Sequence, residues 1–248
     1  MCVRVSGTSD GRPCVARLSS LSASTGTVDL YPDILEMIES VFGDIGAAEE
    51  GRFALPPLGY APDGLGEAYP EELLASHYGI HNKIVSMLNR MVEQARDEQW
   101  CVEGRIPRAM TRTLSLWAWE HAMHCLFWRV LSPSALPRVP DNLGEAMEQQ
   151  YGSVVSAVTL FASLFASIDS RGWGIMGYQP DGKLIIFHTG ELINAQAWPV
   201  KPLLVCDMWE HAYQPVYGQN RSRWMDSFLE MVDWSHVAGR YRPTKTAE

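Results

Sequence analysis

The sequence lacks the cysteine patterns that mark a disulfide framework or a thiolate zinc site. Its five cysteines are odd in number, widely scattered, and include no C-x-x-C pair: Cys2, Cys14, Cys101, Cys125 and Cys206. Scattered thiols of this kind are typical of proteins that work in a reducing compartment. We therefore expect a fold that does not depend on disulfides and a metal site, if there is one, without thiolates.

Long apolar runs and an excess of positive charge are also missing. The formal net charge is -9, from 20 Lys and Arg against 29 Asp and Glu, which argues against a broad surface for nucleic acid. The longest uncharged apolar stretch, residues 154–168, has the length of a buried helix rather than of a membrane span. We predict a globular protein of one or two domains, with no membrane span and no direct nucleic-acid partner.

Residues 1–52 are predicted to be an N-terminal extension and linker. The first 27 residues are rich in Ser, Gly and Thr, and their arginines stand against one acidic residue, Asp10. Such a composition is typical of a flexible tail and also faintly resembles an organellar targeting segment. Tyr31–Phe42 alternates apolar and acidic residues at helical spacing, which predicts a short helix, and residues 43–52 have the composition of an acidic linker.

Two long helices are predicted within residues 53–135. Prolines make residues 54–64 an extended lead-in, and Pro70 before Glu71 and Glu72 marks a helix start, because acids favour the positive end of a helix. We expect this helix to reach about Gln99 and a second one to cover Arg108–Val130, where a proline-rich stretch follows. Two long helices with a short connection favour an antiparallel hairpin as the first domain.

Residues 140–248 are predicted to form a second domain that mixes helices with strands. Helical patterns cover residues 143–151, 154–167 and 221–234, and strand patterns cover 172–178, 183–188 and 202–206. A Pro-Asp-Gly turn at 180–182 joins the first two strands. The predicted fold class is therefore α+β, with a long antiparallel helical hairpin followed by an α/β domain that contains a small three-stranded antiparallel sheet.

The clearest chemical signal is Asp207-Met-Trp-Glu-His211, directly after the last predicted strand. A carboxylate and an imidazole four residues apart can present an oxygen and a nitrogen to one metal ion. Two ligands hold a metal poorly, so others must come from elsewhere in the chain. The candidates are His77 on the first long helix, and His121 and His124 on the second.

Several stretches of the sequence, taken in order, resemble the iron/manganese superoxide dismutases. They are Leu55-Pro-Pro-Leu, His77, His124-Cys-Leu-Phe-Trp128, Leu131-Ser-Pro, Gly172-Trp-Gly, Asp207-Met-Trp-Glu-His-Ala-Tyr213, Arg221 and Trp234. The similarity extends over residues 55–241, and D-x-W-E-H-A-Y is its most specific part. The resemblance implies that superoxide is the substrate, and that a redox-cycling ion disproportionates it to dioxygen and hydrogen peroxide.

The resemblance also assigns roles to individual positions. Four residues match the metal ligands, which in the family hold one manganese or iron ion per chain together with a solvent molecule: His77, His124, Asp207 and His211. Three imidazoles and a carboxylate independently suit a transition metal that changes oxidation state. His81 and Trp173 match residues that line the substrate channel. Glu210 and Tyr213 match positions that reach across a homodimer interface, although Gln214 replaces the tyrosine that normally follows.

The surroundings of the ligands depart from the family pattern. The gateway tyrosine, eight residues after the first ligand, is Val85 here. The solvent-bonding glutamine is absent from both of its usual places, where this chain has Glu191 and Leu192 in one and Glu120 in the other. Glu120 could accept a hydrogen bond from metal-bound solvent and favour the oxidised metal; the alternative is that it pairs with an arginine or faces solvent. Manganese and iron are not distinguished.

Three functions remain open on these grounds. The matching ligands favour a superoxide dismutase with His81, Glu120 and Trp173 at the catalytic site. The lost tyrosine, the N-terminal extension and the apolar stretch also suit a non-catalytic member of a larger assembly, such as a mitochondrial ribosome. A different oxidoreductase with the same metal site has the least support. The location is the mitochondrial matrix or the cytoplasm, and His121, Cys125 and His188 are read as packing or strand residues.

Overall fold

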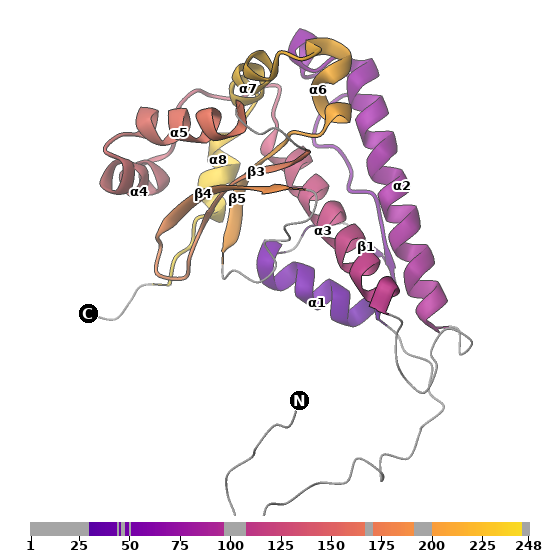
Figure 1. The fold of residues 1–248 in the computed structure, drawn as a ribbon. Helices are drawn as coiled ribbons and strands as arrows, with labels where there is room; N and C mark the ends of the chain where they lie inside the picture. The colour runs from indigo at the N-terminus through magenta and orange to yellow at the C-terminus, as the bar shows by residue number, and fades with distance from the viewer. Residues whose placement is uncertain are drawn as a thin grey trace, which may run out of the picture.

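The computed structural model describes residues 30–43, 45, 48–49, 51–96, 108–166, 171–190 and 200–244. Residues 1–27, for which a targeting role was considered, lie outside these ranges, and so do Glu191 and Leu192. Figure 1 shows two long helices beside a small sheet, with shorter helices around the sheet. This arrangement confirms the predicted α+β class, and strand β5 of the sheet packs against the second long helix.

The two long helices are α2 (Glu71–Arg96) and α3 (Arg108–Val130), which lie side by side (Figure 1). α2 begins where the sequence predicts, after Pro70, with Glu71 and Glu72 in its first turn. Its buried residues recur at intervals of three and four, which is the spacing of a helix with one apolar face. His77 and His81 belong to this buried face, so α2 turns both imidazoles towards α3.

The sheet consists of β3 (Gly172–Tyr178), β4 (Leu184–Gly190) and β5 (Lys201–Asp207), in the order β4-β3-β5 with antiparallel neighbours. All seven residues of the central strand β3 are buried. Trp173 lies opposite Asp207 in the register between β3 and β5. The sheet therefore brings the second half of the predicted site to one end of two neighbouring strands.

The helix predicted over residues 221–234 is wrong in its last part. α7 (Arg221–Glu230) ends early, and a separate helix, α8 (Trp234–Arg240), follows it. Between them Val232 pairs with Leu131, and the amide of Asp233 donates to the carbonyl of Val130. The Asp233 carboxylate then caps α8 by accepting from the amides of Ser235 and His236. A bond to a distant segment thus interrupts a locally helical pattern.

The sequence pattern also missed α6 (Glu210–Tyr217), because Pro215 lies inside it.

Two helices that pack on the sheet, α4 (Asp141–Tyr151) and α5 (Val154–Ala166), match their predicted positions closely. α5 buries Ala157 and Phe161, whereas the side chain of Val155 is 73% exposed. None of the helices in the described ranges is long and apolar enough to cross a membrane.

The predicted extension contains structure of its own. The helix α1 (Tyr31–Phe42) has the predicted bounds and buries Ile34, Ile38 and Phe42, with Phe42 packed edge-on against Trp119 at 5.5 Å. Strands β1 (Ala48–Glu49) and β2 (Arg52–Phe53) pair within the segment read as a linker. The domain division at residue 52 stays a prediction, but α1 packs on α3 and β5 as part of the core.

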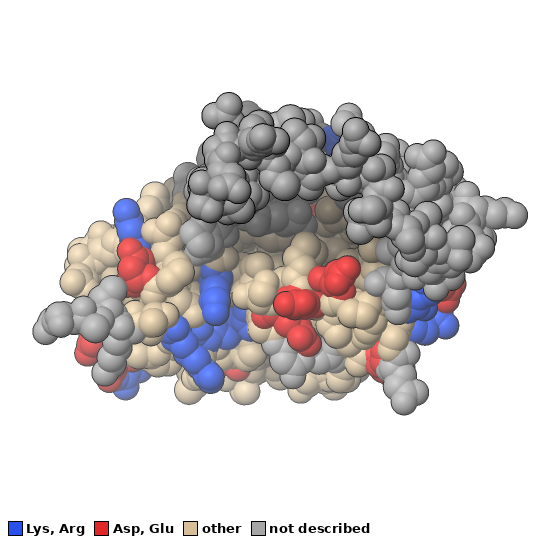
Figure 2. All heavy atoms as spheres, turned by 90° about the horizontal axis from the view of Figure 1, so that it is seen from below, with Lys and Arg blue, Asp and Glu red and all other residues tan. Residues whose placement is uncertain are grey.

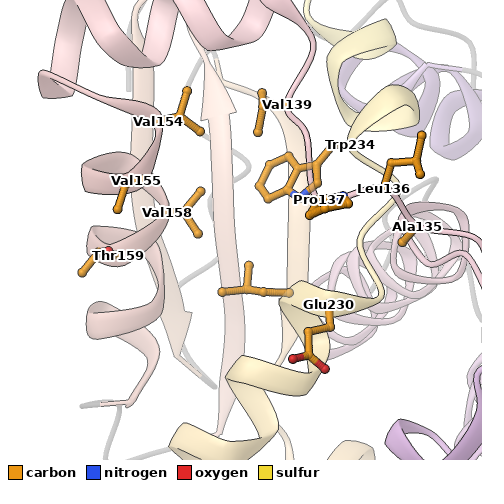
Figure 3. Close-up of a pocket in the computed structure, with 11 residues that line it drawn as sticks. Ala135, Leu136, Pro137, Val139, Val154, Val155, Val158, Thr159, Glu230 and Trp234 are labelled. Atoms are coloured by element: carbon orange, nitrogen blue, oxygen red, sulfur yellow. The ribbon is translucent and has the colours of Figure 1, made fainter.

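Two surface features lie apart from the buried site. An apolar groove of about 390 Å³ runs between α5, the loop after α3 and Trp234, with Val155 and Leu136 on its rim (Figure 3). On the face drawn in Figure 2, acidic and basic side chains of the described residues stand in small groups of both signs. None of the residues that line the groove is a metal-ligand candidate.

Candidate metal centre

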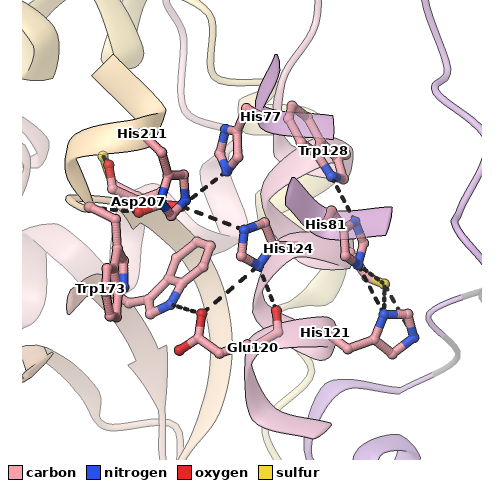
Figure 4. Close-up of polar contacts among 12 residues, drawn as sticks. His77, His81, Glu120, His121, His124, Trp128, Trp173, Asp207 and His211 are labelled. Atoms are coloured by element: carbon pink, nitrogen blue, oxygen red, sulfur yellow. Dashed lines mark hydrogen bonds and ion pairs between the residues drawn. The ribbon is translucent and has the colours of Figure 1, made fainter. Parts of the chain in front are cut away.

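The four predicted ligands converge from four different elements. His77 comes from α2, His124 from α3, Asp207 from the end of β5 and His211 from the first turn of α6, and their donor atoms all lie within 4.8 Å of one another. Asp207 Oδ2 is 3.1 Å from His77 Nε2, 3.3 Å from His211 Nε2 and 3.8 Å from His124 Nε2. Figure 4 shows the rings turned towards this carboxylate. The sequence prediction of one convergent cluster therefore agrees with the geometry.

The same four atoms are buried without a hydrogen-bond partner: Nε2 of His77, His124 and His211, and Oδ2 of Asp207. Buried polar atoms are nearly always hydrogen-bonded, because leaving one unpaired costs about 1–3 kcal/mol. Four such atoms that crowd around one point, with only one another as polar neighbours, are explained by a cation, which all of them can bind at once. Three nitrogens and one carboxylate oxygen fit manganese or iron.

The outer atoms of three candidate ligands are held by the protein. His124 Nδ1 donates to the carbonyl oxygen of Glu120 at 2.7 Å, and His77 Nδ1 lies 2.6 Å from the hydroxyl of Tyr69. Asp207 Oδ1 accepts from the amide of Trp209 at 2.7 Å. These contacts leave Nε2 of each ring and Oδ2 of the carboxylate free for an ion, which is the usual arrangement around metal ligands.

The charges of three of the four candidate ligands suit metal binding. Burial lowers the pKa of His77, and it lowers the pKa of His124 to about 3, so both rings are neutral at pH 7. Burial alone would raise the pKa of Asp207, but the neighbouring His211 and His77 outweigh it and lower that pKa. The carboxylate is therefore ionised, while both imidazoles offer a lone pair.

Glu120 lies beside the ligands rather than in solvent. Its Oε2 accepts from the indole of Trp173 at 3.1 Å and is 4.0 Å from His124 Nδ1, and the residue is 9% exposed. Burial, and then the charge of Asp207, raise the pKa of Glu120 to about 8. Of the two readings left open by the sequence, this geometry favours a carboxyl group that acts on the metal centre, because no arginine pairs with it among the described residues.

Known proteins match most of the chain. Residues 139–240 match the family model of iron/manganese superoxide dismutases, C-terminal domain. A superoxide dismutase [Mn] from Pseudomonas aeruginosa is 29% identical over 195 residues, which cover 76% of this chain and 96% of the relative. A superoxide dismutase [Fe] from Bordetella pertussis is 30% identical over 190 residues, 75% of this chain and 97% of the relative. The chain belongs to the iron/manganese superoxide dismutase family.

Both metals occur among the matching relatives. A mitochondrial superoxide dismutase [Mn] from Schizosaccharomyces pombe is 28% identical over 195 residues, which cover 77% of this chain and 88% of the relative. Manganese and iron relatives thus match at similar identity.

A second cluster of donor atoms lies next to the four candidate ligands. His81, His121 and Cys125 are all buried, and the His81 ring stacks on that of His124 with centroids 5.0 Å apart. The indole of Trp128 donates to His81 Nδ1 at 3.1 Å, so a neutral His81 carries its proton on Nε2, which lies 2.9 Å from His121 Nδ1. This direction makes the cluster a hydrogen-bond chain, because Nε2 of His81 has no lone pair to offer a second metal.

The remaining residues singled out from the sequence lie around or outside this centre. Val85 is buried on α2, and His188 is exposed on β4, away from the ligands. Glu210 pairs with Arg171 of the same chain at 3.1 Å, and Tyr213 accepts from Arg221 Nε at 2.9 Å. Both candidate interface residues therefore have partners within one chain.

Sequence reasoning missed Tyr69 as a contact of a ligand. It precedes Pro70 and lies eight residues before His77, outside the helix that carries that ligand. No periodic pattern relates a loop residue to a helical one at this spacing. The only signal available was its place at the helix start, which says that the chain turns there but does not say where the side chain points.

Proposed function

We propose that the chain is a metal-dependent superoxide dismutase that binds one manganese or iron ion through His77, His124, Asp207 and His211. The convergence of four buried, unpaired donor atoms carries the proposal. Membership of the dismutase family supports the choice of metal and substrate. When bound, the ion would accept an electron from one superoxide and return it to another, giving dioxygen and hydrogen peroxide.

The residues of the chain would hold, orient and shield this chemistry. His77 and His124 are completely buried and give neutral nitrogens, and Asp207 supplies the one negative ligand. The second product needs protons, and the Glu120 carboxyl group, buried beside the candidate ligands and 4.0 Å from His124 Nδ1, is an acidic group in a position to take one up and pass it on. Trp173 fixes Oε2 of that group, and His81 packs on the ligand His124, which are the roles we propose for these two residues.

Access to the centre is proposed from the side of Glu120 and His211. Their side chains are 11% and 24% exposed, whereas those of His77, His124 and Asp207 are 0% exposed. His81 and Trp173, which match channel residues of the family, are 0% and 1% exposed in this chain. A small anion would therefore approach between Glu120 and His211, because His211 is the most exposed of the four candidate ligands.

A homodimer through Glu210 and Tyr213 is part of the proposal and rests on their family positions. Arg171 already holds the exposed Glu210 side chain, so a partner would meet a pre-arranged carboxylate, while Tyr213 lies buried behind it and is held by Arg221. Sedimentation analysis of the purified chain tests this part. A monomer at micromolar concentration would contradict it.

The central test is metal analysis of natively purified protein together with a superoxide assay. We expect close to one manganese or iron ion per chain and catalytic removal of superoxide. The Asp207→Ala variant should lose both, because it removes the anionic ligand. Protein that holds the metal but does not consume superoxide would overturn the enzymatic proposal. No observation on the described residues favours the non-catalytic assembly member considered from the sequence.

A further inference from the structure

The Tyr69 hydroxyl lies within hydrogen-bond distance of Nδ1, the outer nitrogen of the candidate metal ligand His77. Tyr69 is fully buried between the 3-10 turn Gly66–Ala68 and α2, and its hydroxyl oxygen is 2.6 Å from His77 Nδ1. We propose that Tyr69 is a positioning residue that holds His77 in the orientation and tautomer that bind the metal. This inference rests on the proposed ligand set but not on superoxide as the substrate.

The protons of His77 support this role. A neutral imidazole that binds an ion through Nε2 must carry its proton on Nδ1. Nε2 of His77 faces Asp207 Oδ2 at 3.1 Å inside the cluster of candidate ligands, while Nδ1 faces the Tyr69 hydroxyl. The phenol oxygen can accept the Nδ1 proton, which fixes the ring and leaves the Nε2 lone pair pointing into the site.

Tyr69 is itself held firmly enough to orient a ligand. Its ring packs against Trp224 with centroids 5.6 Å apart, and the hydroxyl of Tyr217 donates to the carbonyl of the preceding residue, Ala68. The indole of Trp224 also donates to the backbone oxygen of Asp207 at 3.0 Å. One tryptophan thus supports both Tyr69 and the Asp207 backbone, so the positions of two ligands are coupled through it.

The two ligands on the long helices differ in how they are held. His124 Nδ1 donates to a backbone carbonyl one turn earlier on its own helix, which no substitution removes. His77 depends on a side chain from outside its helix. The Tyr69→Phe variant therefore deletes a single hydroxyl group and keeps the aromatic packing, which isolates the effect on His77.

The experiment titrates Co²⁺ and Mn²⁺ into the metal-free wild type and into Tyr69→Phe. Loss of such an outer hydrogen bond typically weakens metal binding about 10–100-fold, and we expect a change in this range. The matched control is Tyr151→Phe, which removes a phenol hydrogen bond to Leu184 on the far side of the sheet and should leave affinity unchanged. Circular dichroism checks that both variants fold.

Two spectroscopic readouts separate positioning from a general structural role. In the Co²⁺-loaded wild type, the Nδ1–H proton of His77 should give a slowly exchanging, hyperfine-shifted signal that is lost in Tyr69→Phe. In the metal-free wild type, ¹⁵N shifts of the His77 ring should show the Nδ1–H tautomer. This second measurement needs no variant, so it holds even if Tyr69→Phe folds poorly.

Equal metal affinities in wild type and Tyr69→Phe, or an Nε2–H tautomer in the metal-free wild type, would overturn the inference. A wild type that binds neither Co²⁺ nor Mn²⁺ would overturn both the ligand set and the role of Tyr69. If metal binding weakens in Tyr69→Phe but the loaded wild type does not consume superoxide, the positioning role stands and the proposed function fails.

Discussion

Glu120 is a titratable residue that lies beside the candidate ligands without belonging to their cluster. Its carboxyl group is fixed by Trp173 and faces His124. Burial, and then the charge of Asp207, raise its pKa to about 8 without a cation nearby, and a bound cation would lower that pKa because positive charge stabilises the carboxylate. In the loaded site we therefore expect an anion next to the ligand shell.

An anion in this place favours the oxidised metal, so Glu120→Gln should raise the reduction potential. The amide keeps the shape and a hydrogen-bond acceptor for Trp173 but removes the negative charge. Redox titration of the two loaded proteins measures the difference. A potential that does not move would mean that Glu120 stays protonated beside the metal, and the proposed electrostatic role would be wrong.

For single residues, the sequence predicts contacts between partners that are close along the chain. Asp207 and His211 are four residues apart and could be read directly, and the family pattern placed His77 and His124. The contact of Tyr69 with His77 was not predicted, because it depends on how a loop enters α2. The same limit applies to the pairing of His81 with His121, which joins two helices and has no local signal.

Among the helices and strands, β3 begins at a residue that has no room for a side chain. It lies between β4 and β5, and a methyl group at Gly172 would overlap the backbone oxygen of Thr189 on β4. The next residue, Trp173, holds Glu120. The strand can therefore deliver Trp173 to the site only if its first residue has no side chain.

The variant Gly172→Ala should cost about 1–3 kcal/mol of unfolding free energy, as overpacking in a tight core does. Urea denaturation measures it. Gly79→Ala is the matched control, since nothing lies near the added methyl group on α2, and there the change should stabilise the helix by about 0.5–1 kcal/mol. Similar stabilities of the two variants would show that β3 and β4 can separate at little cost.

Helix α8 carries a titratable group whose effect on stability has a definite sign. Burial, and then the charge of Arg240, lower the pKa of His236 below 6.5, with Arg129 acting the same way and Asp233 opposing. The unfolded chain thus takes up a proton at a higher pH than the folded one. Folding stability is unaffected well above pH 6.5 and falls as the pH drops below that value.

Replacing His236 with Gln should remove this part of the acid sensitivity. Between pH 8 and pH 5.5, the unfolding free energy of the metal-free variant should fall less than that of the metal-free wild type. The other buried histidines contribute equally to both proteins, so the difference reports on His236. Parallel pH profiles would contradict the lowered pKa.

The elements were predictable where one local pattern decides. Pro70 with two acids fixed the start of α2, and the Pro-Asp-Gly turn fixed the hairpin of β3 and β4. The break between α7 and α8 was not predictable, because it depends on Val232 pairing with Leu131, about a hundred residues earlier. Helix α6 tolerates Pro215, which a propensity argument counts as a helix breaker.

On the scale of the whole molecule, the centre ties together parts that are far apart in sequence. His77 and His124 belong to the helix pair, whereas Asp207 and His211 follow the sheet. Without an ion, four donor atoms are buried unpaired at the junction of these two parts. The ion should therefore stabilise the junction as well as supply the chemistry.

Removing the metal with a chelator should lower the unfolding temperature of the whole chain. An ion that binds only the folded state, at a free concentration of 100 times its Kd, adds about 2.7 kcal/mol, which for a chain of this size corresponds to roughly 5–11 °C. Calorimetry of the metal-free and the reconstituted protein measures the shift. His124→Ala, which removes one ligand, should show little shift on metal addition. An equal shift in this variant would mean that the ion acts elsewhere, and the convergence of the four elements would then need another explanation.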